Sequence, residues 1–361
     1  MVSALRREWA GAAELEVTVD GAPVKALSYT ALTGWPQLGD LVLLNTTALA
    51  LELGTGGYAL VVAVPGRLPA DPSGPGHLVK ARYTPLQATV LGADEQGSPY
   101  HDLLRDADDL DGMPVVVADL HSALPAVLAA YYAERMARGN SPARPRVAYV
   151  MLDGGALPAW FSRTIPALRE SGWLAGTVTV GQAFGGDLEA VSLHSGLLAA
   201  RHVLGAELAI VSQGPGNLGT GTRWGFSGVA AGEAVNAAAV LGGRPVASLR
   251  ISDADPRERH RGISHHSLTS YGRVALARAD VVLPALPGEF GERVSAAAAP
   301  LAARHNLVLV SVAGLADALR ACPVRLSTMG RGLDEDLAYF LAAAAAGRHA
   351  AVLAGGRAAG Q

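Results

Sequence analysis

The chain has 361 residues, of which 50% are hydrophobic, only 5% are aromatic and 17% are charged. Disordered chains combine low hydrophobicity with high net charge, so this composition excludes that class. The 29 basic and 32 acidic side chains leave a formal net charge of -3, which argues against a nucleic-acid binder because there is no general basic field to collect phosphates. The single cysteine, Cys322, excludes an intrachain disulfide and a metal site with several cysteine ligands.

Residues 1–95 contain short strand patterns broken by Gly and Pro. Residues 14–19 alternate in polarity, and the Asp20-Gly21 pair that follows them is a strong hairpin turn. Regularly spaced short strands predict a small β-barrel domain over 1–95, and an acidic stretch after it predicts a polar connector over 96–112. The further strands are expected at 24–29, 41–45, 58–64 and 77–83.

From Pro114 onward, continuous apolar strands alternate with helical patterns. This alternation predicts a Rossmann-like, mostly parallel, doubly wound α/β domain over 113–361. Such sheets bind ligands beyond the carboxyl ends of their strands. The strands are expected at 115–118, 147–152, 176–181, 208–212, 246–252, 281–283 and 307–312, with 324–327 as a further candidate. The helices are expected near 122–137, 158–171, 187–204, 228–241 and 265–278.

A glycine-rich loop follows the expected strand at 208–212. Its backbone N–H groups and two hydroxyls could bind an anion. It lacks the lysine of a P-loop and the spacing of a dinucleotide fingerprint. The alternative is a tight crossover that needs positive φ angles. The candidate anion-binding residues of this loop are Gly214, Gly216, Gly219, Thr220, Gly221 and Thr222.

The segment 252–269 is the densest in functional side chains. Arg257 and Arg259 could hold an anion bidentately. His260, His265 and His266, which we call the histidine cluster, offer acid–base groups near neutral pH or metal ligands. Neighbouring histidines in a helix point about 100° apart, which disfavours joint ligation of a metal ion. Whether the cluster binds a metal is therefore left open by the sequence. The alternative is an exposed loop whose charges pair with one another.

Other candidates follow expected strands or begin expected helices. Asp153 and Asp187 are candidate complementary carboxylates for the histidine cluster, and Asp187 is also expected to cap the helix near 187–204. Ser264 is expected to cap the helix that starts near His265. Structural roles are the alternative for three candidate pocket-edge residues. These are His121, Ser122 and His194.

Several long runs resemble the signatures of a known family, in the expected order. They are NTTALALELGTGGYALVVAV, YVMLDGGALPAWFSRTIPAL, GTVTVGQAFGGDLEAVSLHSGLLAARHVLGAE, GPGNLGTGTRWGFSG and ISDADPRERHRGISHHSLT. They are similar to an uncharacterised bacterial family, domain of unknown function 3866, and the likeness spans nearly the whole chain. The resemblance implies no established activity, substrate or catalytic residue.

The residues alone favour an enzyme, a hydrolase or group transferase, that acts on a small anionic metabolite at the carboxyl edge of the sheet. One alternative is a non-catalytic metabolite-binding or regulatory module. Another is a divalent-metal-dependent hydrolase that uses Asp153, Asp187 and the histidine cluster.

We expect no nucleic-acid partner and no membrane association, because the apolar run 337–346 is about half the length that spans a bilayer. The N-terminus lacks the apolar stretch of a secretory signal, so we expect a cytoplasmic protein. Ala-rich helices near 295–303 and 337–346 suggest packing surfaces for a homo-oligomer.

Overall fold

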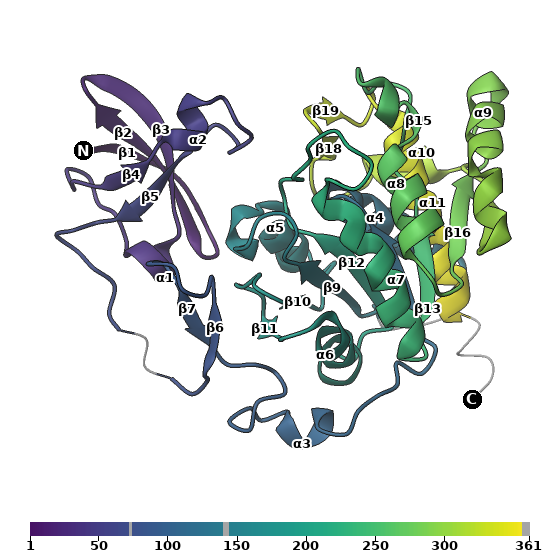
Figure 1. Cartoon of the computed structure of the whole chain (residues 1–361), viewed down its shortest axis with the longest axis horizontal. Helices are drawn as coiled ribbons and strands as arrows, with labels where there is room; N and C mark the ends of the chain where they lie inside the picture. Colours follow the sequence, from purple (N-terminus) through teal and green to yellow (C-terminus); the bar gives the residue numbers. More distant parts are fainter. Residues whose placement is uncertain (72–73, 140–143, 356–361) are drawn as a thin grey trace.

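The computed structural model describes residues 1–71, 74–139 and 144–355, which form an N-terminal β region beside a larger α/β region (Figure 1). Five N-terminal strands form one mixed sheet in the order β1-β2-β3-β5-β4. They are β1 (Val2–Trp9), β2 (Ala12–Val19), β3 (Ala22–Ser28), β4 (Leu43–Asn45) and β5 (Ala59–Ala63). Short helices α1 (Thr30–Thr33) and α2 (Thr47–Ala50) lie between these strands, and α3 (His101–Leu104) lies in the expected connector.

Within the described residues this sheet is open, so the expected closed barrel is wrong. Closure requires the two edge strands, β1 and β4, to pair with one another at a consistent stagger. Strand β4 has only three residues and pairs with β5 alone. The next two strands, β6 (Leu78–Lys80) and β7 (Ala88–Val90), form a separate hairpin instead of completing the sheet.

The hairpin turn expected at Asp20-Gly21 is confirmed. Strands β2 and β3 pair in antiparallel register, with Val19 opposite Ala22. Asp20 has a φ of 49° and Gly21 a φ of 79°, which are the two positive values that the favoured two-residue hairpin turn requires.

The α/β region contains an eight-stranded, entirely parallel sheet in the order β11-β10-β9-β12-β8-β13-β16-β17. Its strands are β8 (Pro114–Ala118), β9 (Val147–Leu152), β10 (Gly176–Thr179), β11 (Leu188–Glu189), β12 (Leu208–Gln213), β13 (Arg244–Ser248), β16 (Asp280–Pro284) and β17 (Asn306–Val310). The expected strand at 324–327 is not part of it. Small hairpins are formed by β14 (Ile251–Ser252) with β15 (Gly262–Ile263), and by β18 (Ser327–Thr328) with β19 (Arg331–Gly332).

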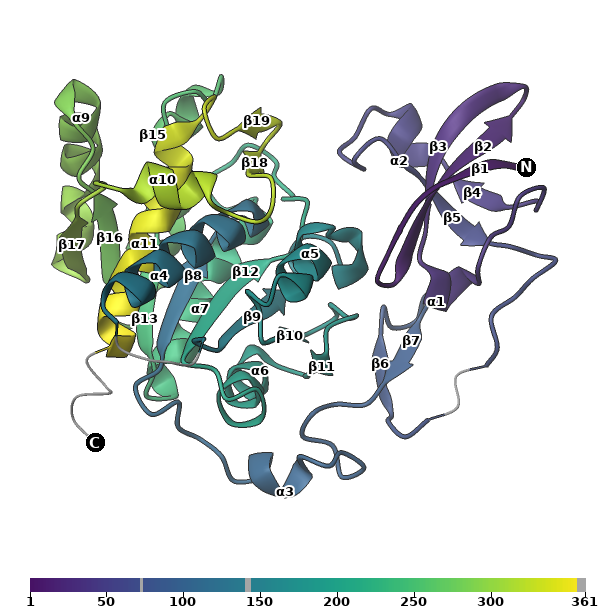
Figure 2. The ribbon, with the colours of Figure 1, turned by 180° about the vertical axis from the view of Figure 1, so that it is seen from behind.

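Helices cover both faces of this sheet, as the sequence predicts (Figures 1 and 2). Alternate strand residues divide between two cores, because successive side chains of a strand point to opposite faces. Val116 packs with α4 (Leu124–Ala137) and α11 (Leu337–Gly355), whereas Val117 packs with α6 (Leu193–Leu198) and α7 (Ala230–Val240). The helices are α4 (Leu124–Ala137), α5 (Thr164–Glu170), α6 (Leu193–Leu198), α7 (Ala230–Val240), α8 (His265–Thr269), α9 (Gly288–Ala298), α10 (Leu315–Arg320) and α11 (Leu337–Gly355).

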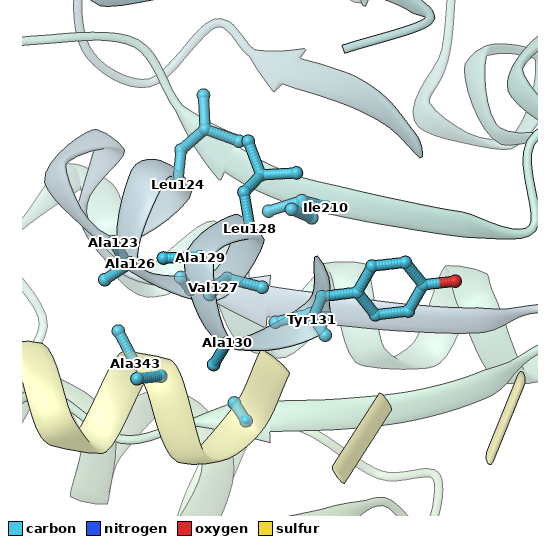
Figure 3. Packing of buried hydrophobic residues seen from close by; sticks show 14 of the residues in the cluster. Ala123, Leu124, Ala126, Val127, Leu128, Ala129, Ala130, Tyr131, Ile210 and Ala343 are labelled. Atoms are coloured by element: carbon cyan, nitrogen blue, oxygen red, sulfur yellow. The ribbon is translucent and has the colours of Figure 1, made fainter. Parts of the chain in front are cut away.

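Helices α4 and α11 pack closely under the sheet. Figure 3 shows Leu128 of α4 beside Ile210 of β12, with Ala343 on α11 at the other side of α4. A Cβ atom at Gly347 would lie 2.1 Å from the carbonyl oxygen of Val127, so only glycine permits this approach.

Of the described residues, one helix, α11, is long and apolar enough to cross a membrane by length and composition. Of that apolar window, 78% is buried inside the protein. Residues 338–346 of this helix are buried in the core of the chain, and the expected homo-oligomer stays a prediction.

Sheet topology places three strand ends side by side. Strand β8 lies between β12 and β13. The chain leaves β8 through α4 on one face and leaves β12 through α7 on the other face. The connections therefore diverge at the centre of the sheet, which is where doubly wound folds form a ligand crevice.

A buried lysine attaches the N-terminal region to the α/β region. The Lys80 side chain is 2% exposed, and its Nζ donates to the carbonyl oxygens of Gly181, Ala183 and Ala190 at 2.7, 3.0 and 2.9 Å. The Glu189 carboxylate lies 3.5 Å from the same Nζ. Burial lowers the pKa of Lys80 and raises the pKa of Glu189, so each group depends on the other for its charge.

Candidate functional site

The three neighbouring strand ends carry buried polar side chains that meet one another. Gln213 ends β12, Asp119 follows β8, and Arg250 lies two residues beyond β13. Nε2 of Gln213 donates to the carbonyl oxygen of Asp119 at 2.9 Å. Nη1 of Arg250 lies 3.5 Å from Oδ2 of Asp119. None of these was singled out as a candidate from the sequence, although their positions at or just beyond the carboxyl ends of parallel strands could have indicated them.

The histidine cluster lies against these strand ends. The β14–β15 hairpin folds His260 back beside the first turn of α8, which carries His265 and His266. The centroid of the His260 ring lies 5.1 Å from that of His265 and 4.8 Å from that of His266, and the centroids of His265 and His266 are 4.5 Å apart. One ligand atom from each ring lies within 4.8 Å of those of the other two. The structure therefore brings together the three residues of the histidine cluster, whereas the candidate pocket-edge histidines lie outside it.

Two of the rings are fixed through Nδ1. Nδ1 of His266 lies 3.0 Å from Oδ2 of Asp119, and Nδ1 of His260 lies 2.7 Å from Oγ of Ser264. Ser264 also accepts from the backbone N–H of His266, which confirms the expected helix cap. Phe226 stacks on the His266 ring, with centroids 3.8 Å apart and planes 5° from parallel.

Burial keeps part of the cluster uncharged. It lowers the pKa of His260 to about 3, with further contributions from the charges of Arg250 and Arg257. It also lowers the pKa of His265, where the neighbouring charges of His266 and Arg259 act in the same direction. His260 and His265 are thus neutral imidazoles at pH 7, with lone pairs available.

Several buried polar atoms at this site have no hydrogen-bond partner within the described residues. They are Nε2 of His265, Oδ1 of Asp119 and Oε1 of Gln213. Buried polar atoms in folded proteins are nearly always paired with protein, water or an ion. The site therefore offers unsatisfied polar atoms from three separate segments of the chain.

A network of arginines and aspartates is joined to the site through Arg250, which contacts both Asp119 and Asp255. Arg257 grips Asp255 with two hydrogen bonds of 2.9 and 2.8 Å, and Arg331 contacts both Asp255 and Asp336. Burial of Asp255 opposes its ionisation, but hydrogen bonds and charges from Arg257 and Arg250 outweigh burial and hold the pKa of that carboxyl well below its usual range. Both ends of the Arg257 fork are thus engaged within the protein.

Arg259, the other expected anion-binding arginine, is exposed. No ion pair is found for it among residues 1–71, 74–139 and 144–355. Its charge is close enough to His265 to lower the pKa of that ring.

The glycine-rich loop is largely bonded to itself. Oγ1 of Thr220 lies 3.1 Å from Oγ1 of Thr222, and the N–H of Thr220 donates to the carbonyl oxygen of Gly225. Gly216 and Gly221 have φ angles of 92° and 79°, as the tight-crossover alternative requires. Gly214 is buried, whereas Gly216, Gly219, Thr220, Gly221 and Thr222 are exposed.

The end of this loop contacts the site. A Cβ atom at Gly228 would lie 1.6 Å from Oδ1 of Asp119. Phe226, two residues earlier, stacks on His266.

Asp153 and Asp187 have hydrogen-bond partners outside the histidine cluster, and they line two different cavities. Oδ2 of Asp153 accepts from the N–H of Gln182 at 3.0 Å, and the residue lines a cavity of about 370 Å³ with Lys80. Asp187 accepts from the N–H of Thr177 at 2.7 Å and lines another cavity, of about 300 Å³. The carboxylate in contact with the histidine cluster is Asp119.

The expected helix cap at Asp187 is wrong, because α6 begins only at Leu193 and its cap is Ser192. His194 therefore does not share a helix face with Asp187, and it is exposed.

His121 and Ser122 are tied into the interior at the start of α4. Nδ1 of His121 lies 2.9 Å from the hydroxyl of Tyr149, and Nε2 lies 2.8 Å from Oγ of Ser162. Burial lowers the pKa of His121 to about 4. Oγ of Ser122 lies 2.7 Å from the hydroxyl of Tyr339. These contacts agree with the structural alternative for both residues.

Comparison with known proteins gives one match. A family profile described as "Protein of unknown function (DUF3866)" matches residues 25–347. The chain belongs to this family. The match includes Asp119, the histidine cluster and Asp336, so the whole site lies within the DUF3866 region. No curated protein and no solved structure gives a significant match. Membership of DUF3866 thus brings no activity or substrate with it, and a function must be argued from the site.

Proposed function

We propose that this DUF3866 protein is a hydrolase of a small anionic metabolite, with its reaction centre at the histidine cluster. The observation that carries the proposal is the convergence of three imidazoles and Asp119 at the central strand ends of a doubly wound sheet. Ligands bind at that position in such folds. Perturbed titratable groups gathered in one place are a mark of functional sites.

The charges around the cluster favour an anionic substrate. Arg259 is exposed beside His265, and the guanidinium of Arg250 lies buried behind it. An arginine binds carboxylate or phosphate oxygens through paired N–H donors. Arg257 contributes to the local positive field, but its Nε and Nη2 donors are engaged by Asp255, whereas no ion pair is found for Arg259 in the described part of the chain. We therefore assign anion capture to Arg259.

Hydrolysis at this site would use the cluster to activate a water molecule. The water oxygen forms a bond to the electrophilic carbon or phosphorus of the substrate, while one water proton passes to the activating group. The bond to the leaving group then breaks, and the leaving group takes up a proton. A group transferase would follow the same course with another nucleophile in place of water.

The proposal is tested by assaying the full chain against phosphomonoesters, phosphodiesters and carboxylate-bearing esters and amides. We expect turnover of at least one anionic class, with a loss of about 100-fold or more in His265→Gln. His194→Gln, at an exposed histidine outside the cluster, is the matched control and keeps full turnover. Arg259→Gln raises KM for the anionic substrate more than it lowers kcat.

The non-catalytic alternative gives a different result. A metabolite-binding module would show thermal stabilisation by an anionic compound with no product formed. If an anionic compound stabilises the wild type and His265→Gln equally and neither forms product, a binding function would replace the hydrolase proposal.

A further inference from the structure

We infer that the histidine cluster binds one divalent transition-metal ion of the zinc class, with Asp119 as a positioning residue for His266. The inference deepens the proposed function, and rests on it for the choice of site, because it names the group that would activate water. It rests on four features of the described residues: ring convergence, the engagement of Nδ1 in two of the three rings, unpaired polar atoms and donor chemistry.

The first feature is the distance between donor atoms. One ligand atom from each of the three rings lies within 4.8 Å of those of the other two. Zn–N bonds of about 2.0–2.1 Å in tetrahedral geometry put nitrogen atoms about 3.4 Å apart. Side-chain rotation on metal binding would have to close the remaining gap. The expectation that neighbouring histidines diverge does not hold here, because His265 is the first residue of α8 and His260 approaches from a separate segment.

The second feature is the way in which two of the rings are held. His266 and His260 use Nδ1 for Asp119 and Ser264, which leaves Nε2 of each ring for another partner. Metal-bound histidines commonly donate their other N–H to a carboxylate, which fixes the tautomer and the ring orientation. The Asp119–His266 pair has this arrangement, and Phe226 adds a flat surface that holds the His266 plane.

The third feature is the set of unpaired buried atoms. Nε2 of His265 is buried without a hydrogen-bond partner in the described part of the chain, and so is Oδ1 of Asp119, whose residue is 3% exposed. An ion at the cluster would pair directly with the His265 nitrogen. A water bound to that ion would be a suitable donor for a nearby carboxylate oxygen.

Donor chemistry then selects the kind of metal. Imidazole nitrogens suit Zn²⁺, Co²⁺ and related ions, whereas Mg²⁺ and Ca²⁺ prefer oxygen ligands. Catalytic zinc sites keep three protein ligands and an open position, and the ion lowers the pKa of its bound water to about 7. The cluster supplies three nitrogen ligands, which leaves such a position for water or substrate.

The test measures the metal without using turnover. Full-length protein, stripped with a chelator, is titrated with Co²⁺ alone while the visible absorption bands are recorded, and Zn²⁺ is then added in competition. We expect one equivalent of Co²⁺ with the intense bands of a four-coordinate site. His265→Ala is expected to lower the affinity by about 100-fold or more. His194→Ala and His349→Ala, outside the cluster, are expected to bind as the wild type does.

Thermal unfolding with and without Zn²⁺ gives a second measurement on the same proteins. Zn²⁺ is expected to raise the Tm of the wild type but not that of His265→Ala, whose removed ring is partly exposed and whose fold should persist. Failure of the wild type to bind Co²⁺ or Zn²⁺, or binding that His265→Ala leaves unchanged, overturns the inference. Metal binding without hydrolysis of any substrate supports this inference and contradicts the proposed function, whereas hydrolysis by metal-free protein does the reverse.

Discussion

Oδ2 of Asp119 lies 3.0 Å from Nδ1 of His266, although the two residues are 147 positions apart in the chain. This contact joins the end of the central strand β8 to the first turn of α8. Both side chains are buried. The residue at the end of strand β8 therefore helps to set the orientation of the His266 ring, in addition to the helix that carries the ring.

Asp119→Asn should reduce function more than it disturbs the fold. The amide keeps the size of the side chain, but it removes the charge that orients His266, and such changes typically cost 10–100-fold, so we expect roughly that loss in Co²⁺ affinity and in turnover. Metal titration and steady-state kinetics measure these effects. The matched control is Asp280→Asn, which alters a second aspartate–histidine pair, with His349 at 2.8 Å. Equal losses in both variants would contradict a specific role for Asp119.

Gly228→Ala should displace Asp119. The added Cβ would lie 1.6 Å from Oδ1 of Asp119, so the carboxylate must move or the backbone must shift. Overpacking of this kind typically costs about 1–3 kcal/mol in the free energy of unfolding. Denaturant unfolding gives the stability, and Co²⁺ affinity reports the position of the carboxylate. Gly54→Ala, where a Cβ meets open space, should change neither quantity. A fully stable Gly228→Ala protein with normal metal affinity would refute this prediction.

The two lysines of the chain should differ sharply in their effect on stability. Lys80→Met leaves Glu189 and three carbonyl oxygens without their cation, and breaking a buried ion pair costs about 3–5 kcal/mol. Lys25→Met removes a half-exposed lysine paired with Glu14 at 3.6 Å, so its cost should stay below about 1 kcal/mol. Urea unfolding of the two variants provides the comparison. Similar midpoints would mean that Lys80 does not anchor the N-terminal region.

His121 should make the fold sensitive to acid. Burial lowers the pKa of its ring from about 6.5 to about 4, so the unfolded chain binds a proton in this interval that the folded chain excludes. The stabilisation is present above pH 6.5 and is lost as the pH falls to about 4, by about 3 kcal/mol. In His121→Gln this part of the pH dependence should vanish. Free energies of unfolding at several pH values test this, and parallel curves for the two proteins would exclude His121 as the source.

Much of the α/β architecture could be predicted from the sequence because its strands are buried on both faces. Runs such as 147–152 and 208–211 are continuously apolar, and this pattern is typical of strands covered on two sides. The N-terminal region was harder to predict. Short half-exposed strands carry the same local signals in an open sheet as in a barrel, and closure depends on edge pairing between distant strands.

The histidines of the candidate site could be predicted from the sequence, but the carboxylate that contacts them could not. The three histidines are close in sequence, so local density indicated them. Asp119 contacts them only through the strand order β12-β8-β13, which no local pattern records. Asp153 and Asp187 follow strands of the same sheet, but β9 and β10 lie farther from the centre and carry these carboxylates away from the cluster.

The packing of α4 on α11 has a consequence for synthesis of the protein in the cell. Gly347 lies against Val127, so the last helix of the described chain covers one of the first helices of the α/β region. The surfaces of α4, β8, β13 and β16 that α11 covers therefore stay exposed until α11 itself has been synthesised. Contacts this distant in sequence slow folding and expose apolar surface in the meantime. A truncation that removes only α11 would thus leave a nascent-like intermediate, and chaperones would be expected to recognise it.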